Sequence, residues 1–279
     1  MKKFEIVKKE LITPNTYLMD IYAPRIAKKS LAGQFIILRP TENGERIPLT
    51  TADVDREKGL VTIIFQMVGL TTNILGGLNV GDCLHDFVGP LGRPSELDNL
   101  KKVICVGGGV GTAVVYPAVK QLHENGAQVD VIVGARSKEY VILEDQIKQN
   151  SSNLYITTDD GSYGRKGFVT DQLKDLLDKS NDYDEVIAIG PMIMMKFVCK
   201  LTEQYNVKTT VSLNPIMVDG TGMCGGCRVS VGGEVKYACV DGPDFDGHKV
   251  DFDELMKRQA TYTEEEKEKE HICGGIYHD

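Results

Sequence analysis

A short segment near the C-terminal end, in which cysteines lie among glycines, constrains this chain more than any other feature. It reads Asp219-Gly220-Thr221-Gly222-Met223-Cys224-Gly225-Gly226-Cys227, and Cys239 follows after eleven further residues. Thiolates are soft ligands that suit zinc or iron–sulfur clusters. Glycines let a backbone wrap closely around a bulky metal cluster, where side chains would collide with it. The segment therefore predicts a sulfur-ligated metal centre in this part of the chain.

The spacing of the cysteines indicates which kind of centre this is. The plant-type 2Fe–2S loop has the frame C-x4-C-x2-C and a distant fourth cysteine. This chain matches the frame at every position except the first, which is occupied by Asp219. A carboxylate carries the same unit charge as a thiolate but is a harder donor, so it is expected to change the reduction potential. We expect a 2Fe–2S cluster held by four residues, namely Asp219, Cys224, Cys227 and Cys239.

Three alternatives stay open for this segment. Cys273 could replace Asp219 as the fourth ligand. A structural zinc site could use the three cysteines with Asp219 or with His248, although zinc ribbons normally use two paired cysteine knuckles and this chain has one. Asp219 could instead only cap the turn over Gly220-Thr221-Gly222, a role that aspartate often fills.

The remaining cysteines and the overall charge argue against several classes of protein. The chain has 279 residues, seven cysteines and a net charge of −8. An odd number of cysteines, and no apolar run after the first residues, argue against export and disulfides, so we expect Cys83, Cys105 and Cys199 to be inert core residues. The negative charge argues against nucleic-acid binding, and no apolar run approaches the ~20 residues that a membrane span needs. We expect a cytoplasmic protein without nucleic-acid or membrane partners.

The length predicts two domains and an appendage. In residues 1–96, short β-rich stretches are separated by Gly, Pro and Asn, which predicts a small antiparallel barrel. The clearest of these stretches are Thr16–Ile21, Gln34–Leu38 and Val61–Phe65. The stretch Gly89-Pro90-Leu91-Gly92-Arg93-Pro94 cannot continue a helix or a central strand, so it is interpreted as a linker.

Residues 97–213 have a different pattern of apolar residues. Apolar runs with helix-compatible sequence between them begin near Val103, Val129, Leu154, Val186 and Thr209. Strands that alternate with helices imply βαβ units and a parallel sheet covered on both faces. Residues 214–279 hold the cysteine segment and a charged stretch at 264–270, which is interpreted as a solvated helix face. The expected fold class is a β-barrel followed by a parallel-sheet α/β domain and a small C-terminal iron–sulfur region.

Two turns at the expected carboxyl ends of strands point to a nucleotide. Gly107-Gly108-Gly109-Val110-Gly111-Thr112 follows an expected strand and precedes an expected helix over Ala113–Glu124. Glycines there let a diphosphate approach the backbone and the N–H groups of the helix N-terminus. The full G-x-G-x-x-G fingerprint is absent, because Thr112 takes the place of the last glycine, and a tight structural turn is the alternative. Gly190-Pro191-Met192 ends another strand at the same edge, and together the two turns favour nicotinamide binding.

The order of barrel, βαβ domain and cysteine segment resembles the ferredoxin–NADP reductase superfamily. More narrowly, the chain resembles the electron-transfer subunits of dihydroorotate dehydrogenases and, most closely, the small (α) subunits of NADH-dependent ferredoxin:NADP+ oxidoreductases. Asp219 favours the second group, because the dihydroorotate-linked relatives normally keep four cysteines. The resemblance covers nearly the whole chain and rests on the following motifs: Arg46-Ile47-Pro48-Leu49-Thr50, Val68-Gly69-Leu70-Thr71-Thr72, Gly107 to Gly111, Gly134-Ala135-Arg136, Thr158-Asp159-Asp160-Gly161-Ser162, Gly190-Pro191 and Cys239-Val240-Asp241-Gly242-Pro243.

The resemblance implies that the barrel holds FAD. Pro48-Leu49-Thr50 would lie along the flavin, with Thr50 nearest its reactive edge as the catalytic residue. The family arginine usually lies where this chain has Ile47, so Arg46 is shifted by one position, although its long guanidinium could still reach the FAD diphosphate. Many relatives carry a cysteine where this chain has Ile189. The diphosphate would also meet Val68, Gly69, Thr71 and Thr72.

The same resemblance implies an NAD(H) site in the second domain. Arg136 and Lys138 could neutralise a ribose 2′-phosphate, whereas Asp159 or Asp160 could accept a hydrogen bond from a ribose 2′-hydroxyl, and the family favours NADH. The implied site residues are Gly108, Gly109, Val110, Gly111, Thr112, Arg136, Asp160, Gly190, Pro191 and Met192.

These parts together imply a function in electron transfer. A nicotinamide gives only a hydride, an iron–sulfur cluster takes only single electrons, and a flavin can do both. The resemblance implies an enzyme subunit that passes electrons between NAD(H), FAD and the 2Fe–2S cluster. Its partner would be a larger subunit with further flavin and iron–sulfur centres, in a heterodimer that couples NADH, NADP(H) and ferredoxin by electron bifurcation.

Three other functions stay open. The chain could be the electron-transfer subunit of a dihydroorotate or sulfide dehydrogenase. It could be a flavin and iron–sulfur carrier or redox sensor that does not turn over nicotinamide. It could also be a zinc-stabilised binding module without redox chemistry.

Overall fold

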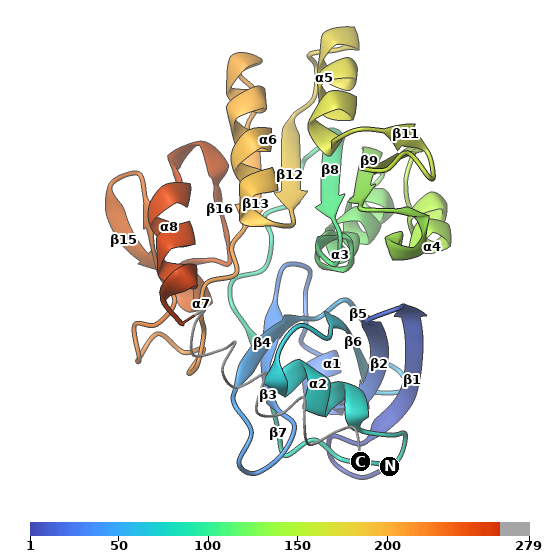
Figure 1. Cartoon of the computed structure of the whole chain (residues 1–279), viewed down its shortest axis with the longest axis vertical. Helices are drawn as coiled ribbons and strands as arrows, with labels where there is room; N and C mark the ends of the chain where they lie inside the picture. Colours follow the sequence, from blue (N-terminus) through green and yellow to red (C-terminus); the bar gives the residue numbers. More distant parts are fainter. Residues whose placement is uncertain (263–279) are drawn as a thin grey trace.

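The structure is a computed structural model, and it describes residues 1–262. The alternative ligand Cys273 and the charged stretch 264–270 lie outside the described residues. Figure 1 shows the chain as two stacked halves, with the N-terminal β-rich part below and the α/β part above. The C-terminal part of the described chain lies beside both halves. No helix among the described residues is both long enough and apolar enough to cross a membrane.

The N-terminal half is built from two antiparallel sheets around one core. The first sheet has the order β1-β2-β6-β5, with β1 at Ile6–Thr13, β2 at Thr16–Tyr22, β6 at Leu60–Gln66 and β5 at Asp53–Asp55. The second has the order β4-β3-β7, with β4 at Ile47–Thr50, β3 at Phe35–Arg39 and β7 at Asp86–Leu91. The short helices are α1 at Pro24–Ala27 and α2 at Leu70–Gly77. Side chains of both sheets, such as Ile21, Ile36 and Phe87, share one core, and the expected antiparallel barrel is confirmed.

The expected linker is wrong in its first half. Gly89, Pro90 and Leu91 lie in β7, which pairs with β3, and only the residues after Leu91 leave the sheet. Proline has no N–H to give to a sheet, so it is confined to edge strands and irregular positions. Strand β7 is the edge of its sheet, and the pairing register shifts between Phe35 and Ile37, which lets Pro90 fit.

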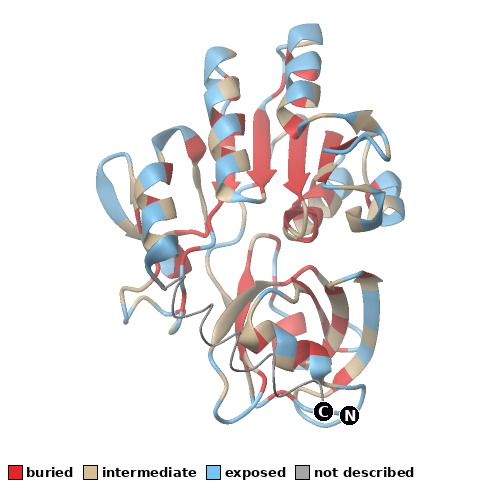
Figure 2. Ribbon diagram, in the orientation of Figure 1, coloured by how far each residue is buried: buried red, intermediate tan, exposed pale blue. Residues whose placement is uncertain are grey.

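The second half is a seven-stranded sheet in the order β11-β10-β9-β8-β12-β13-β16, parallel except for β16 at Asp244–Asp246. Its strands are β8 at Lys102–Gly108, β9 at Gln128–Ala135, β10 at Asn153–Thr158, β11 at Arg165–Lys166, β12 at Glu185–Ile189 and β13 at Thr209–Ser212. The five strands expected from apolar runs are thus confirmed, and the central ones are buried along their length (Figure 2).

Helices cover both faces of this sheet. On one face, α3 at Gly111–Glu124 and α4 at Glu144–Gln149 pack through residues such as Val115, Leu122 and Ile147. On the other, α5 at Val169–Lys179 and α6 at Met192–Gln204 pack through residues such as Leu173 and Val198. Helix α3 begins two residues before the expected start at Ala113. A 3-10 turn, η1, spans Lys138–Tyr140.

The C-terminal part joins the two halves. Its elements are the hairpin β14 at Arg228–Val231 with β15 at Glu234–Tyr237, then α7 at Ala238–Asp241, β16 at Asp244–Asp246, η2 at Gly247–Lys249, α8 at Phe252–Gln259 and η3 at Ala260–Tyr262. Strand β16 pairs antiparallel with β13, and Phe252 of α8 packs into the core of the sheet. Cys227 and Cys239 pack against Phe35 and Ile37 of the barrel. We keep the division into residues 1–96, 97–213 and 214–279 as a proposal.

The cysteines outside residues 219–239 are not all placed as expected. Cys105 and Cys199 are buried core residues, and burial raises the pKa of both thiols, that of Cys199 to about 12. Cys83 is exposed, so the expectation that it lies in the core is wrong. It sits outside the named strands, in a single bridge to Glu5 at the end of the barrel.

Candidate functional site

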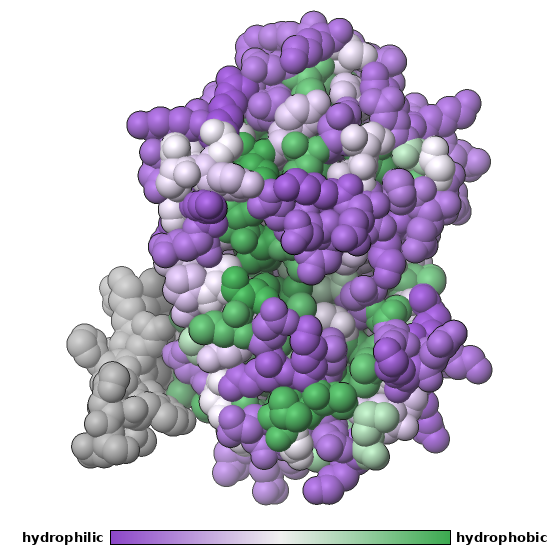
Figure 3. Space-filling model, turned by 90° about the vertical axis from the view of Figure 1, so that its right-hand side faces the viewer, coloured by the Kyte–Doolittle hydropathy of each residue, from purple (hydrophilic) through white to green (hydrophobic). Residues whose placement is uncertain are grey.

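A cavity of about 1190 Å³ lies where the barrel meets the carboxyl ends of the parallel strands. In a side view of the molecule, apolar surface gathers near the boundary between the two hydrophilic halves (Figure 3). From the barrel the cavity is lined by Asn15, Thr16, Phe35, Pro48, Leu49, Thr50 and Gln66. From the α/β half it is lined by Gly108 to Gly111, Arg136, Asp159, Phe168, Gly190 and Pro191, among others. The expected flavin strand and the expected nucleotide turns thus face one cavity.

The nucleotide loop, residues 107–112, joins β8 to α3. A Cβ on Gly111 would lie 2.4 Å from the backbone oxygen of Ile189, and one on Gly108 would lie 2.4 Å from the sulfur of Met194. These glycines therefore let α3 and the Gly190 turn approach each other closely. Gly109 differs, because it has a φ of +55° and nothing lies within 4 Å of its Cβ position. The open space at Gly109 and the N-terminus of α3 fit a diphosphate group.

Thr112, which replaces the last glycine of the fingerprint, does not line the cavity. It is fully buried, and a Cβ on Gly107 would lie 2.8 Å from the Cα of Thr112. Its hydroxyl has no hydrogen-bond partner among the described residues. Thr112 thus supports the tight turn from inside, and Gly107 is the residue that makes room for it.

Strand β4 carries the expected flavin residues. Pro48, Leu49 and Thr50 all line the cavity. The hydroxyl of the next residue, Thr51, is buried without a hydrogen-bond partner among the described residues. Thr51 does not line the cavity, so this hydroxyl does not face a cofactor there, and the residues of β4 that would lie along a flavin are Pro48, Leu49 and Thr50.

The expected diphosphate residues of the barrel lie outside the cavity lining, at the start of α2. The Thr72 hydroxyl accepts hydrogen bonds from the N–H groups of Val68 and Gly69 and donates to the Gly69 oxygen, so it caps the helix. The Thr71 hydroxyl donates to Glu45. Nothing lies within 4 Å of a Cβ on Gly69, which leaves its backbone open to a ligand. The Thr71 and Thr72 hydroxyls thus make hydrogen bonds within the protein, whereas the Gly69 backbone is open to a ligand.

The two acidic residues after β10 have different positions. Asp159 lines the cavity together with Arg136. Asp160, the residue expected in the site, accepts a hydrogen bond from the Ser162 N–H, which together with the Ser162 hydroxyl lowers the pKa of its carboxyl. Asp160 therefore caps a turn, and Asp159 is the acid of this pair that lines the cavity.

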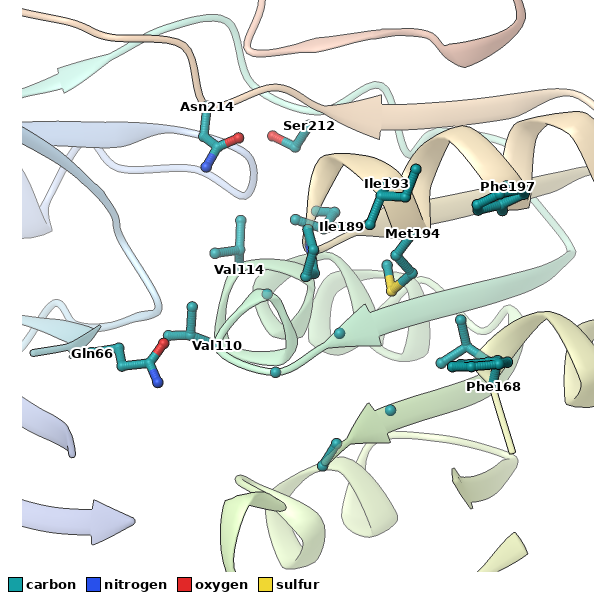
Figure 4. Close-up of a pocket in the computed structure, with 18 of the residues that line it drawn as sticks. Gln66, Val110, Val114, Phe168, Ile189, Ile193, Met194, Phe197, Ser212 and Asn214 are labelled. Carbon is teal, nitrogen blue, oxygen red and sulfur yellow. The ribbon is translucent and has the colours of Figure 1, made fainter. Parts of the chain in front are cut away.

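Apolar side chains that the sequence did not single out line the far end of the cavity. Phe168, Ile193 and Phe197 are 66%, 50% and 53% exposed, although large apolar residues usually avoid water. Figure 4 shows Phe168 and Phe197 toward the same end of the cavity, away from Gln66 and Asn214. Ile193 and Met194 line the cavity, whereas the expected Met192 does not. The only sequence signal was an aromatic directly before α5 and another on the polar side of α6.

The cysteine loop, residues 219–227, lies against the barrel. The Cys227 and Cys239 sulfurs are 3.2 Å apart and buried, and all the described cysteines are free. Burial and the neighbouring Cys227 raise the pKa of the Cys239 thiol to about 12. Cys224 is exposed, and the N–H groups of Gly226 and Asp219 hold the pKa of its thiol below the usual range. Three thiols around glycines with positive φ are a donor set that fits an iron–sulfur cluster.

Asp219 caps the turn that precedes the cysteines. Its Oδ2 accepts hydrogen bonds from the Thr221 N–H at 2.9 Å, the Thr221 hydroxyl at 2.5 Å and the Met223 N–H at 3.2 Å. These bonds, and then the charge of Arg46, lower the pKa of the carboxyl. No hydrogen bond from a described residue reaches Oδ1. The cap and a ligand role are therefore compatible, because they use different oxygens.

Other residues in the alternatives lie elsewhere. The His248 ring nitrogen Nε2 is 2.9 Å from the Thr202 hydroxyl, so His248 packs on α6 and not beside the cysteines. Within residues 1–262, no group of three or more His, Cys, Asp or Glu side chains is arranged around one metal-ion position. Arg46, expected at the FAD diphosphate, does not line the cavity and instead donates from Nε to the Val218 oxygen at 2.7 Å.

The cavity and the cysteines share a wall. Phe35 and Met217 line the cavity, and both belong to the buried cluster that contains Cys227 and Cys239. Met217 was not singled out in the sequence, because a methionine outside any motif carries no signal. The Cys227 and Cys239 side chains therefore pack behind the part of the cavity wall that Phe35 and Met217 form.

Comparisons with known proteins agree with this geometry. Residues 214–251 match the family described as the iron–sulfur cluster binding domain of dihydroorotate dehydrogenase B, and residues 105–200 match the oxidoreductase NAD-binding domain. The chain is 49% identical to a Thermotoga maritima homologue of the dihydroorotate dehydrogenase B (NAD+) electron transfer subunit, over 94% of this chain and 93% of the relative. It belongs to the family of these electron-transfer subunits and their homologues. It is also 58% identical to an uncharacterized Clostridium beijerinckii protein encoded in the adh 3′ region, over 94% of this chain and 92% of the relative.

A solved structure resembles the whole electron-transfer subunit. It comes from work on flavin-based electron bifurcation by an NADH-dependent reduced ferredoxin–NADP oxidoreductase, and it superposes with a TM-score of 0.93. Sequence identity is 46%, with 100% of this chain and 99% of that chain covered. The comparisons confirm the expected fold, the oxidoreductase class and the cofactor set of FAD, a 2Fe–2S cluster and NAD(H). An electron-transfer subunit also implies a larger catalytic partner.

Proposed function

We propose that this chain is the NADH-reactive electron-transfer subunit of an electron-bifurcating, NADH-dependent reduced ferredoxin:NADP+ oxidoreductase. The observation that carries the proposal is that the nucleotide loop, the flavin strand β4 and the cysteine loop meet at one cavity and its Phe35–Met217 wall. A chain with only a redox-sensing role needs no nucleotide loop at the flavin strand. The 46% identity to the oxidoreductase structure over the full chain supports this assignment.

The residues have distinct roles in this proposal. When bound, the flavin converts the hydride of NADH into single electrons that the 2Fe–2S cluster accepts. Pro48 and Leu49 would hold the flavin ring in the cavity, and the Thr50 hydroxyl would donate a hydrogen bond at its reactive edge. The backbone of Gly109 to Gly111 and the N-terminus of α3 bind the nucleotide diphosphate. Gly190 and Pro191 close the same end of the cavity.

Asp159 selects NADH over NADPH in our proposal. This residue lines the cavity, where its carboxylate accepts a hydrogen bond from a ribose 2′-hydroxyl and repels a 2′-phosphate. Arg136 lines the same region and attracts negative charge. The proposal is that the carboxylate outweighs the guanidinium.

We propose that Asp219 is the fourth cluster ligand, together with Cys224, Cys227 and Cys239. Its Oδ2 is committed to the turn, so Oδ1 would be the donor to iron. The cap fixes the carboxylate and removes part of the entropy cost of binding the metal. The dihydroorotate-linked relatives normally keep a cysteine at this position, which is why Asp219 favours the bifurcating oxidoreductase.

The partner in this proposal is a larger subunit with its own flavin and iron–sulfur centres, at which ferredoxin and NADP(H) react. The second candidate is the electron-transfer subunit of a dihydroorotate dehydrogenase, which the names of the relatives favour. Purification of the native heteromer decides between them. We expect NADH together with reduced ferredoxin to reduce NADP+, with two electrons from one NADH and two from two one-electron ferredoxins reducing two NADP+ to NADPH. Dihydroorotate oxidation by the heteromer, without coupled ferredoxin turnover, would select the second candidate.

A further inference from the structure

Arg46 connects the barrel to the cysteine loop. It directly precedes β4, the strand whose Pro48 and Leu49 line the cavity. Its Nε donates a hydrogen bond to the Val218 oxygen at 2.7 Å, across 172 residues of sequence. Val218 is the residue immediately before Asp219. The side chain thus reaches away from the cavity and holds the chain where the cysteine loop begins.

The backbone next to this contact forms the seat of the cysteine loop. Ile47 and Pro48 of β4 pair with Leu38 and Ile37 of β3. A Cβ on Gly220 would lie 3.0 Å from the Ile37 side chain, so the loop rests directly on this strand. The start of the loop therefore packs on the Ile37 side chain and is preceded by a residue that Arg46 holds through a hydrogen bond.

The charge of Arg46 is only partly neutralised by its neighbours. Its Nη1 lies 3.8 Å from Asp86, at the limit of an ion pair, whereas the Arg39 Nε lies 2.8 Å from the same carboxylate oxygen. Asp86 is thus mainly the partner of Arg39. The Arg46 guanidinium lies next to the start of the cysteine loop, because its Nε reaches the oxygen of the residue directly before Asp219. Its side chain is 31% exposed, so solvent and salt reduce its field without removing it.

We propose that Arg46 is a positioning residue for the cysteine loop: it fixes the Val218–Asp219 segment on the flavin strand, and its positive charge raises the reduction potential of the cluster that the loop holds. Each electron that enters a cluster adds negative charge, which a nearby cation stabilises. The inference rests on the proposed function only in that the loop holds a 2Fe–2S cluster. It assigns Arg46 to the cluster and not to the FAD diphosphate.

The test compares three variants of the full chain with its cofactors. Arg46→Gln removes the charge but keeps a long side chain with an N–H donor, and Arg46→Lys keeps the charge but loses the planar fork. Arg39→Gln is the matched control. It removes the positive charge of the arginine that pairs with the same Asp86 carboxylate, and the hydrogen bonds of Arg39 go to Asp86 and Glu42 and not to the cysteine loop. The readouts are iron and FAD content and a redox titration followed by electron paramagnetic resonance.

We expect Arg46→Gln to lower the ratio of reduced to oxidised cluster by about threefold at the wild-type midpoint potential. Arg46→Lys should restore most of that ratio, and Arg39→Gln should leave it unchanged. The shift should shrink as salt is added. FAD content should stay the same in all three variants.

Two results would overturn the inference. If Arg46→Gln loses FAD while the cluster ratio stays at the wild-type value, Arg46 serves the flavin. If Arg46→Lys shifts the ratio as far as Arg46→Gln, the charge is not the cause. A wild-type chain without the 2Fe–2S resonance signal would instead contradict the proposed function, so the two failures are distinguishable.

Discussion

The nucleotide loop and the cysteine loop are both rich in glycine, but for different physical reasons. In the nucleotide loop, Gly108 and Gly111 have no room for a Cβ, because backbone or side-chain atoms lie 2.4 Å away. In the cysteine loop, Gly222 and Gly225 have φ values of +86° and +69°, and their nearest non-neighbouring atoms lie at 3.2 and 3.8 Å. Gly108 and Gly111 are therefore required for close packing, whereas Gly222 and Gly225 are required for their backbone conformation.

Because of this difference, the two loops should also differ in how much they contribute to the stability of the fold. The nucleotide loop is part of the packed core of the parallel sheet, so changes there should destabilise the α/β half. The cysteine loop rests on the barrel through few buried side chains, so changes there should affect the cluster more than the fold. Substitutions in the two loops should therefore have separable effects on stability and on the cluster.

The largest effect is expected for Gly111→Ala. Its Cβ would meet the Ile189 oxygen and the Gly190 Cα, which are backbone atoms that cannot rotate away. We expect a loss of about 3 kcal/mol in the free energy of unfolding, measured by urea denaturation. The control is Gly109→Ala, which has open space but a φ of +55° and should lose only about 1 kcal/mol. Equal losses in both variants would refute the packing explanation.

The next effect concerns Cys227→Ser. It removes a buried sulfur ligand, so iron content and the visible absorbance of the cluster should fall to background. The rate at which NADH bleaches the flavin should change by less than about twofold. Cys227 is not part of the nucleotide loop, and substitutions at separate sites usually act independently. Loss of flavin reduction along with the cluster would show that the two loops are not separable.

Asp219 variants should change the cluster without removing all of it. Asp219→Ala takes away the turn cap and the proposed ligand, so we expect lower iron content and a cluster more sensitive to oxidation. Asp219→Cys restores the plant-type frame and should keep the cluster with a shifted resonance spectrum. Cys273→Ala is the comparison variant. An unchanged spectrum in Asp219→Ala, with cluster loss in Cys273→Ala, would move the fourth ligand to Cys273.

The smallest effect is expected at Asp159. Asp159→Ala removes the carboxylate that repels a 2′-phosphate, while Arg136 stays in the cavity. We expect the ratio of kcat/KM for NADPH to that for NADH to rise about tenfold, which corresponds to about 1.4 kcal/mol. Asp160→Ala is the matched control, because Asp160 caps a turn and should leave the ratio unchanged. If Asp160→Ala changes the ratio and Asp159→Ala does not, the assignment of the two acids is reversed.

The fold and the sulfur-ligated metal centre could be predicted from the sequence because both depend on local patterns, whereas FAD was implied by the resemblance to a family. The apolar runs of the parallel strands and the cysteine frame are set by spacing along the chain, and spacing is visible in a sequence. The direction of Arg46 is not visible, because it depends on Val218, which is far away in sequence. Phe168, Phe197 and Met217 were missed for the same reason, since only tertiary packing brings them to the cavity.

Errors at single residues also have physical causes. Pro90 argued against a strand, but an edge strand with a register shift tolerates it. Cys83 was expected in the core because buried cysteines are common, but it lies in a connection at the end of the barrel. Asp159 and Asp160 are adjacent and chemically identical, so only the structure separates the cavity residue from the turn cap.

An anaerobic titration of the chain, loaded with FAD and its cluster, with NADH tests the central claim most directly. The claim is that NADH enters at this cavity and that its electrons reach the cluster through the flavin. Absorbance reports the flavin, and electron paramagnetic resonance reports the cluster. We predict that NADH bleaches the flavin and that the resonance signal of the reduced cluster then appears. A flavin that stays oxidised in excess NADH, although a chemical reductant bleaches it and reduces the cluster, would contradict the claim.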